Sequence, residues 1–152
     1  MPHFIKESRI AASPSVVFAF HESPGALEKL TPPWEHVEIL QKSDSILPGS
    51  RVVFRVKIGP LAIICEAEHT EYEKGRMFAD RQVRGPFASW YHRHLMLDDG
   101  QGGTILRDEV EYEPPLGWVG KFLSSNLLES RLQRLFNFRH EATQRIVEAN
   151  DF

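Results

Sequence analysis

Residues 36–113 consist largely of short segments in which apolar and polar side chains alternate. Successive side chains of a β-strand point to opposite faces, so this alternation predicts strands with one buried and one solvated face. Turn signals separate the segments, among them Glu73-Lys74-Gly75 and the glycine-rich stretch 98–103. Strands at this spacing predict one continuous antiparallel sheet. The expected strands cover residues 3–12, 36–40, 51–58, 61–72, 76–84, 89–97 and 106–113.

Two short helices are predicted between the first two strands. At Ser13-Pro14 the serine can cap the first amides, and proline tolerates the first helical position. Ser23-Pro24-Gly25 ends the first helix, and residues 26–30 predict a second one. Thr31-Pro32-Pro33-Trp34 ends the second, because each residue before a proline is pushed out of the α region.

One long helix is predicted over residues 118–149, with a single stripe at three-four spacing. At ~1.5 Å per residue it runs about 45 Å, enough to cover the sheet. We expect the stripe to pack on the concave sheet face that carries Phe54, Val56, Val110 and Tyr112. A straight helix fits a strongly bent sheet poorly, so a cavity between them is expected. The fold class is therefore α+β, a curved antiparallel sheet of about seven strands wrapped around the C-terminal helix. The stripe consists of Leu128, Leu132, Leu135, Phe136, Arg139, Thr143 and Ile146.

Length, net charge and cysteine content exclude several classes of function. The 152 residues predict a single domain, 1–152, that needs no metal or disulfide to support its core. The net charge of −3, with dispersed lysines and arginines, argues against nucleic-acid binding. Cys65 is the single cysteine, which suits a cytoplasmic protein. The N-terminus lacks the apolar core of a signal peptide, and no segment approaches the ~20 apolar residues that span a bilayer.

The segment 78–94 places polar and aromatic residues at every second position of two strands joined by Gly85-Pro86. Phe78, Asp80 and Gln82 share one face of the first strand, and Trp90, His92 and His94 share one face of the second. Hairpin geometry puts Asp80 opposite one of the histidines, and Asp108 on the next strand opposite one of the same two. These residues predict a polar row across three strands, with Gln82 and Tyr112 close by. The other face of 89–97, with Tyr91, Leu95 and Leu97, would also make an acceptable inner face.

Three interpretations of this row stay open: a buried network that satisfies itself, a polar anchor for a ligand in a pocket, or acid–base catalysis by a histidine held by Asp108. A histidine between two aspartates is expected to favour its charged form. A metal site is the weaker hypothesis, because His-x-His spacing alone is not a zinc motif. No cofactor is expected. The remaining candidates are assigned as follows: Glu66, Glu68, His69, Glu71 and Glu73 to a solvated strand and turn, Trp34 and Trp118 to caps near the cavity mouth, and His21 and His140 to no role.

The chain resembles the START-like helix-grip superfamily, also called SRPBCC, and within it a bacterial polyketide cyclase/dehydrase-like branch. Some members of that branch lie ahead of an epimerase-like domain, which is not expected here because the chain ends with its helix. The resemblance favours the histidine face of 89–97 as the inner face. It is carried by Phe18-Ala19-Phe20-His21, Leu30-Thr31-Pro32-Pro33-Trp34, Phe78-Ala79-Asp80-Arg81-Gln82, Gly85-Pro86-Phe87, Trp90-Tyr91-His92-Arg93-His94, Gly103-Thr104, Asp108-Glu109-Val110-Glu111-Tyr112 and Phe136-Asn137-Phe138-Arg139.

Three functions follow as hypotheses. The first is binding of a small apolar or aromatic molecule between the sheet and the long helix. The second is a cyclase or dehydratase that acts through His92 or His94 with Asp80 or Asp108. The third is a regulatory module that binds a partner protein. For the first, the expected cavity residues are Phe54, Phe78, Asp80, Gln82, Trp90, His92, His94, Asp108 and Tyr112.

Overall fold

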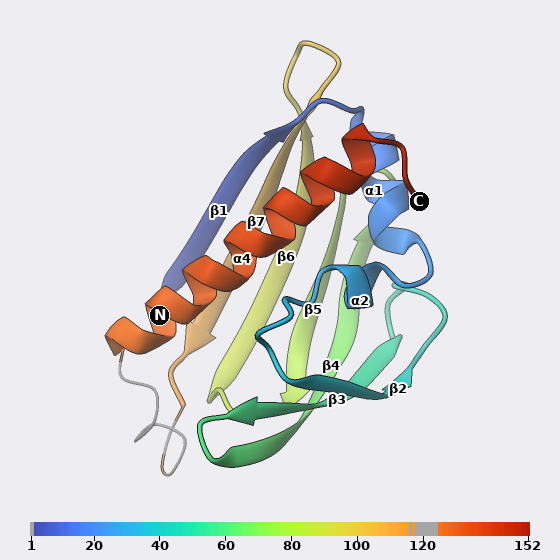
Figure 1. Cartoon of the computed structure of the whole chain (residues 1–152). Helices are drawn as coiled ribbons and strands as arrows, with labels where there is room; N and C mark the ends of the chain where they lie inside the picture. Colours follow the sequence, from blue (N-terminus) through green and yellow to red (C-terminus); the bar gives the residue numbers. More distant parts are fainter. Residues whose placement is uncertain (1, 116, 118–124) are drawn as a thin grey trace.

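The computed structural model describes residues 2–115, 117 and 125–152. It confirms the predicted α+β fold: a curved sheet of seven strands, two short helices after the first strand, and a long C-terminal helix (Figure 1). The predicted start of the last helix and Trp118 lie outside the described residues. No helix among the described residues is long and apolar enough to cross a membrane. The elements are β1 (His3–Ile10), α1 (Pro14–Glu22), α2 (Ala26–Lys29), β2 (Val37–Lys42), β3 (Arg51–Ile58), β4 (Leu61–Glu73), β5 (Met77–Arg84), β6 (Ser89–Asp98), β7 (Thr104–Glu113) and α4 (Ser125–Glu148).

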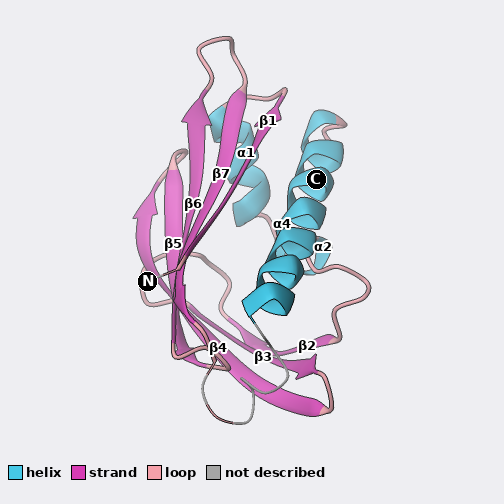
Figure 2. Cartoon of the chain, turned by 90° about the vertical axis from the view of Figure 1, so that its left-hand side faces the viewer, coloured by secondary structure: helices cyan, strands magenta, loops and turns pink. Residues whose placement is uncertain are grey.

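The two short helices begin and end near the predicted residues. Pro14 occupies the first turn of α1, but the Ser13 hydroxyl bonds that of Ser15 and caps no backbone amide. The Ser23 hydroxyl donates a 2.5 Å hydrogen bond to the Phe20 carbonyl at the end of α1. Gly25 then adopts a φ of 80°, a left-handed conformation that glycine reaches without steric cost, and α2 starts directly after it. Because of this tight connection α2 follows α1 directly, and both helices lie on the same side of the sheet as α4 (Figures 1 and 2).

The sheet is antiparallel throughout, in the order β1-β7-β6-β5-β4-β3-β2. The first and last strands in this order are therefore the two edges. On β6, His92 and Met96 are buried, whereas Leu97 is exposed. The inner face thus carries the histidines, and the alternative with Tyr91, Leu95 and Leu97 inside is wrong.

Helix α4 runs along the concave face of the sheet (Figures 1 and 2). Leu128, Leu132 and Phe136 pack against Val110 and Tyr112 of β7, as predicted. The same stripe continues with buried Thr143 and Ile146 toward α1.

The other half of the packing prediction is wrong. Val56 and the half-buried Phe54 belong to a separate cluster with Ile58 and Cys65, away from the helix. The reason is the bend of the sheet: β2 and β3 curl beneath α4 (Figure 2) and do not lie flat against it. Phe54 and Val56 therefore line one side of a cavity, and α4 lines the opposite side.

Candidate functional site

A cavity of about 600 Å³ lies between the concave sheet, α4 and the α1–α2 segment. Apolar side chains from β3 and from the helices form much of its wall, among them Val56, Leu132 and Leu135. Of the predicted cavity residues, Asp108 and Tyr112 do not line it, because both are buried beneath α4. The others do: Phe54, Phe78, Asp80, Gln82, Trp90, His92 and His94.

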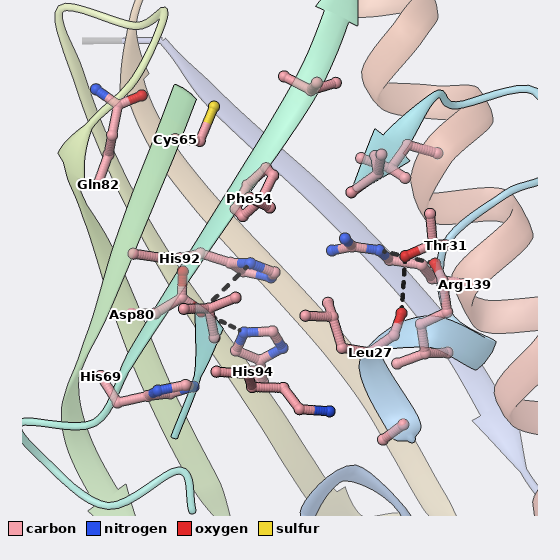
Figure 3. Close-up of a pocket in the computed structure, with 18 of the residues that line it drawn as sticks. Leu27, Thr31, Phe54, Cys65, His69, Asp80, Gln82, His92, His94 and Arg139 are labelled. Atoms are coloured by element: carbon pink, nitrogen blue, oxygen red, sulfur yellow. Dashed lines mark hydrogen bonds and ion pairs between the residues drawn. The ribbon is translucent and has the colours of Figure 1, made fainter. Parts of the chain in front are cut away.

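The polar wall of the cavity is the exposed side of a hydrogen-bonded row across β5, β6 and β7. In register, Asp80 is opposite His92, and His94 is opposite Asp108. The bonds run diagonally: His94 Nε2 lies 2.8 Å from Asp80 Oδ2, and His92 Nε2 lies 2.7 Å from Asp108 Oδ1. His94 Nδ1 is also 3.3 Å from Asp108 Oδ1. Each histidine therefore has a carboxylate partner, and the row joins three strands. Figure 3 shows the part of the row that faces the cavity, Asp80 with His92 and His94.

A fifth residue of the row comes from α4 and was assigned no role from the sequence. His140 Nε2 lies 2.6 Å from Asp108 Oδ2, and its Nδ1 lies 2.8 Å from the Ser8 hydroxyl of β1. His140 is 2% exposed. It continues the four-residue spacing Leu128, Leu132, Phe136, and that spacing was the signal that it faces inward. Through His140 the polar row connects the sheet to the helix.

The charges of the row are set by burial and by these bonds. Burial alone raises the pKa of a carboxyl, but the hydrogen bond from His94 and the nearby imidazoles outweigh it and lower the pKa of Asp80 to about 2. The pKa of Asp108 is lowered well below its usual range, because three histidines oppose the effect of its burial. Burial lowers the pKa of His92, whereas the two carboxylates outweigh burial at His94 and raise its pKa. His94 is thus the histidine that favours the charged form.

Two further histidines line the cavity next to this row. The His94 ring stacks on Phe78 at 4.0 Å, and His69 lies 6.0 Å from the same Phe78 ring. His21 of α1 approaches His94 at 6.5 Å, and burial lowers its pKa to about 4. Both residues were missed because their neighbours come from separate elements.

The prediction that His69 lies on a solvated strand is wrong, since it is 9% exposed. The pairing of β4 with β5 is irregular just beyond it, between His69 and Glu71. For Glu68 the solvated face is correct: its carboxylate binds Arg51 and Arg81 on the outer face of the sheet.

The Gln82 side chain bridges the turn between β5 and β6 through two hydrogen bonds to the backbone of Phe87. Its Nε2 donates to the Phe87 carbonyl at 2.8 Å, and its Oε1 accepts from the Phe87 amide at 3.2 Å. Gly85 makes room for this side chain, because a Cβ there would lie 2.4 Å from Gln82 Oε1. Trp34, expected as a cap near the cavity mouth, does not line the cavity; it is 45% exposed and packs edge-on against Phe138.

Asp80, His92 and His94 also have ligand atoms within 4.8 Å of one another, close enough to hold a metal ion. Nitrogen and carboxylate ligands of this kind suit zinc or iron(II). The Nε2 atoms of both histidines already bond carboxylates, and the raised pKa of His94 favours a proton that a metal would have to displace. A metal here must therefore compete with an existing network.

Comparison with known proteins shows which family this is. No curated protein sequence matches the chain significantly. The structure is similar to that of the protein TTHA0849 from Thermus thermophilus (18% identity, TM-score 0.73, 99% of this chain and 100% of that chain). It is similar to the Zhui aromatase/cyclase from Streptomyces sp. R1128 (16% identity, TM-score 0.76, 97% and 93%). It is also similar to part of a nucleoside-diphosphate sugar epimerase from Corynebacterium glutamicum (20% identity, TM-score 0.74, 95% and 29%).

At these identities the structural likeness establishes the fold, and the sequence establishes the family. The family described as polyketide cyclase/dehydrase and lipid transport matches residues 10–136, which is most of the 152 residues. The match runs from the last residue of β1 into α4 and includes every lining strand of the cavity. The chain belongs to the polyketide cyclase/dehydrase and lipid transport family.

Proposed function

We propose that this protein binds a small apolar or aromatic molecule in the cavity between the sheet and α4. The observation that carries this proposal is the cavity itself, whose volume of about 600 Å³ falls within the range of small-molecule pockets. Protein interiors are normally packed to the density of organic crystals. A domain of this size that leaves such a space under its main helix gives up packing energy, which a ligand can restore.

The distribution of polar groups supports a ligand with one polar end. The histidine–aspartate row occupies one wall, whereas Phe54, Val56 and Leu132 supply apolar surface elsewhere. A few placed polar groups in an apolar pocket fix the orientation of a ligand. Asp80, His92 and His94 are the members of the row that line the cavity, and Asp80 and His94 are bonded to each other.

The proposal is tested with the neutral fluorophore N-phenyl-1-naphthylamine, whose emission rises in apolar surroundings. Ala67 lines the cavity on β4, whereas Ala62 of the same strand is exposed. Ala67→Phe fills the space, so we expect it to weaken binding by about 10-fold or more through steric exclusion, while Ala62→Phe leaves binding unchanged. Native mass spectrometry of gently purified protein should in addition reveal a retained small molecule.

The contradicting results are equally specific. Saturable fluorescence that Ala67→Phe leaves intact places the fluorophore elsewhere and rejects the cavity as the binding site. Absence of any saturable binding by the wild-type chain rejects the proposal for aromatic ligands of this size.

A second candidate, a cyclase or dehydratase, is favoured by one observation. The rings of His92 and His94 lie 3.7 Å apart, and their pKa values are shifted in opposite directions, downward for His92 and upward for His94. A histidine with a lowered pKa beside one with a raised pKa is the kind of base and acid pair that acid–base catalysis uses. Asp108→Asn separates the two functions: in an enzyme turnover falls steeply while binding persists, whereas in a binder affinity weakens modestly and no reaction is lost.

A further inference from the structure

Arg139 lies across the cavity from the histidine–aspartate row. It projects from α4 toward the wall that carries His92 and His94 (Figure 3). The side chain is the one charged member of a stripe that is apolar up to this point, one turn beyond Leu135. A cation at this position faces the ligand space and the apolar surface around it.

The acids near Arg139 are already engaged with other partners. Asp80 and Asp108 bond the histidines, and the Glu35 carboxylate at the rim binds Arg131 through its Nη2 at 2.6 Å and its Nε at 3.2 Å. Within the described part of the chain, no carboxylate lies within 4.0 Å of the Arg139 guanidinium. Arg139 is therefore a half-buried cation without an acidic partner.

Most of its hydrogen-bonding capacity is also unused. The Nε–H donates a long bond of 3.3 Å to the Leu30 carbonyl, and the guanidinium carbon lies over the Phe136 ring at 5.4 Å. An arginine has five N–H donors, and the described residues provide acceptors for one of them. Burial lowers the pKa of Arg139, yet guanidinium stays protonated in proteins. A half-buried cation with free N–H donors facing the cavity is stabilised when an anion pairs with it.

We propose that the ligand of this cavity is an apolar carboxylate, an aromatic or alicyclic acid whose carboxylate pairs with Arg139. The inference rests on the proposed cavity-binding function and adds the chemical class of the ligand. The planar fork of guanidinium matches the two oxygens of a carboxylate, and one unpaired cation neutralises one negative charge. The apolar body of the acid then lies against Phe54 and Val56 on the curled strands.

The test compares two probes of nearly equal shape, 2-naphthoate and the neutral 2-naphthamide, by calorimetry at neutral pH with the full chain. The wild-type protein should bind the acid at least about 10-fold more tightly than the amide, because the carboxylate accepts two N–H bonds as an ion pair, whereas the amide offers one neutral acceptor oxygen and an NH₂ group that arginine cannot satisfy. Arg139→Gln should weaken the acid by roughly 10- to 100-fold and change the amide by less than about 3-fold. Arg139→Lys should retain part of the preference, since the charge remains and the fork is lost.

Arg134→Gln is the matched control, because Arg134 lies on the same helix but is exposed and does not line the cavity. It should keep the acid preference. Thermal unfolding without ligand checks that Arg139→Gln folds, and its midpoint should not fall, because the variant removes an unpaired charge.

The possible outcomes distinguish a failure of the carboxylate assignment from a failure of the proposed cavity-binding function. If the wild-type chain binds acid and amide equally, or if Arg139→Gln weakens both alike, cavity binding stands and the carboxylate assignment is overturned. A lowered midpoint together with equal loss of both probes makes Arg139 a packing residue and also overturns it. If the wild-type chain binds neither probe, the proposed function fails, and the inference fails with it.

Discussion

Asp108→Asn is the substitution that most directly probes the polar row. The Asp108 carboxylate is buried and accepts hydrogen bonds from His92 at 2.7 Å and His140 at 2.6 Å. A hydrogen bond to a charged group contributes about 1.5–3 kcal/mol, so two of them contribute about 3–6 kcal/mol. Asparagine keeps one acceptor oxygen, and the expected loss of unfolding free energy is therefore about 2–4 kcal/mol. For a chain of this length that lowers the midpoint of thermal unfolding by roughly 5–15 °C.

Asp80→Asn is the matched control for this experiment. Asp80 accepts one short hydrogen bond, from His94 at 2.8 Å, and its side chain is 16% exposed against 7% for Asp108. We expect it to cost about half as much, measured by circular dichroism and by denaturant titration. A midpoint for Asp108→Asn within about 2 °C of the wild type, or a larger loss for Asp80→Asn, would refute the assignment of Asp108 as the centre of the row.

Asp108→Asn has a second readout besides stability, namely the pH at which His94 titrates. Its pKa is raised in the folded chain, so its stabilising contribution is present below the unfolded pKa of about 6.5 and is lost as the pH rises through the folded value. Asp108→Asn removes one of the two carboxylates that raise this pKa. We therefore expect the His94 imidazole resonances to titrate at lower pH in the variant, as followed by NMR. An unchanged titration would show that Asp80 alone sets the charge of His94.

Three more predictions follow from burial and charge. Leu132→Asp places an unpaired carboxylate at a side chain that is 4% exposed, so it should lower the free energy of unfolding by more than about 4 kcal/mol in a denaturant titration. Leu127→Asp, at a position 60% exposed, should lower it by less than about 1 kcal/mol. Similar losses in the two variants would contradict the packing of α4. The pKa of His21 is lowered to about 4 in the folded chain, so on acidification the unfolded chain binds this proton first. The free energy of unfolding should therefore fall between pH 6.5 and pH 4 by at most about 3 kcal/mol. His21→Phe should flatten that fall, and an unchanged pH profile of stability would contradict the burial of a neutral His21. Protein purified without chelator should carry far less than one equivalent of zinc, iron or manganese by elemental analysis, because carboxylates already bind the histidines. Stoichiometric metal that is lost in a His92→Ala/His94→Ala double variant would instead establish a metal site.

Local patterns in the sequence determined the elements of this fold. The period-two alternation and the turn residues predicted every strand to within a few residues, because side-chain direction in a strand depends only on position along the chain. The approach of Asp80 and Asp108 to His92 and His94 was also predictable, since short hairpin turns nearly fix the register of neighbouring strands. The single stripe on the last helix predicted its buried face for the same kind of reason.

The tertiary structure decided which distant residues meet. His140 reaches Asp108 from 32 positions further along the chain, and no local rule sets how α4 is rotated and placed over β7. The inward position of His69 lies beside an irregular pairing of β4, and a shift of one residue exchanges the two faces of a strand. The cavity depends on how far β2 and β3 curl away from α4, which separates Phe54 from the helix it was expected to contact (Figure 2). Such packing results from the summed twist and bend of seven strands, and this sum cannot be obtained from any one segment.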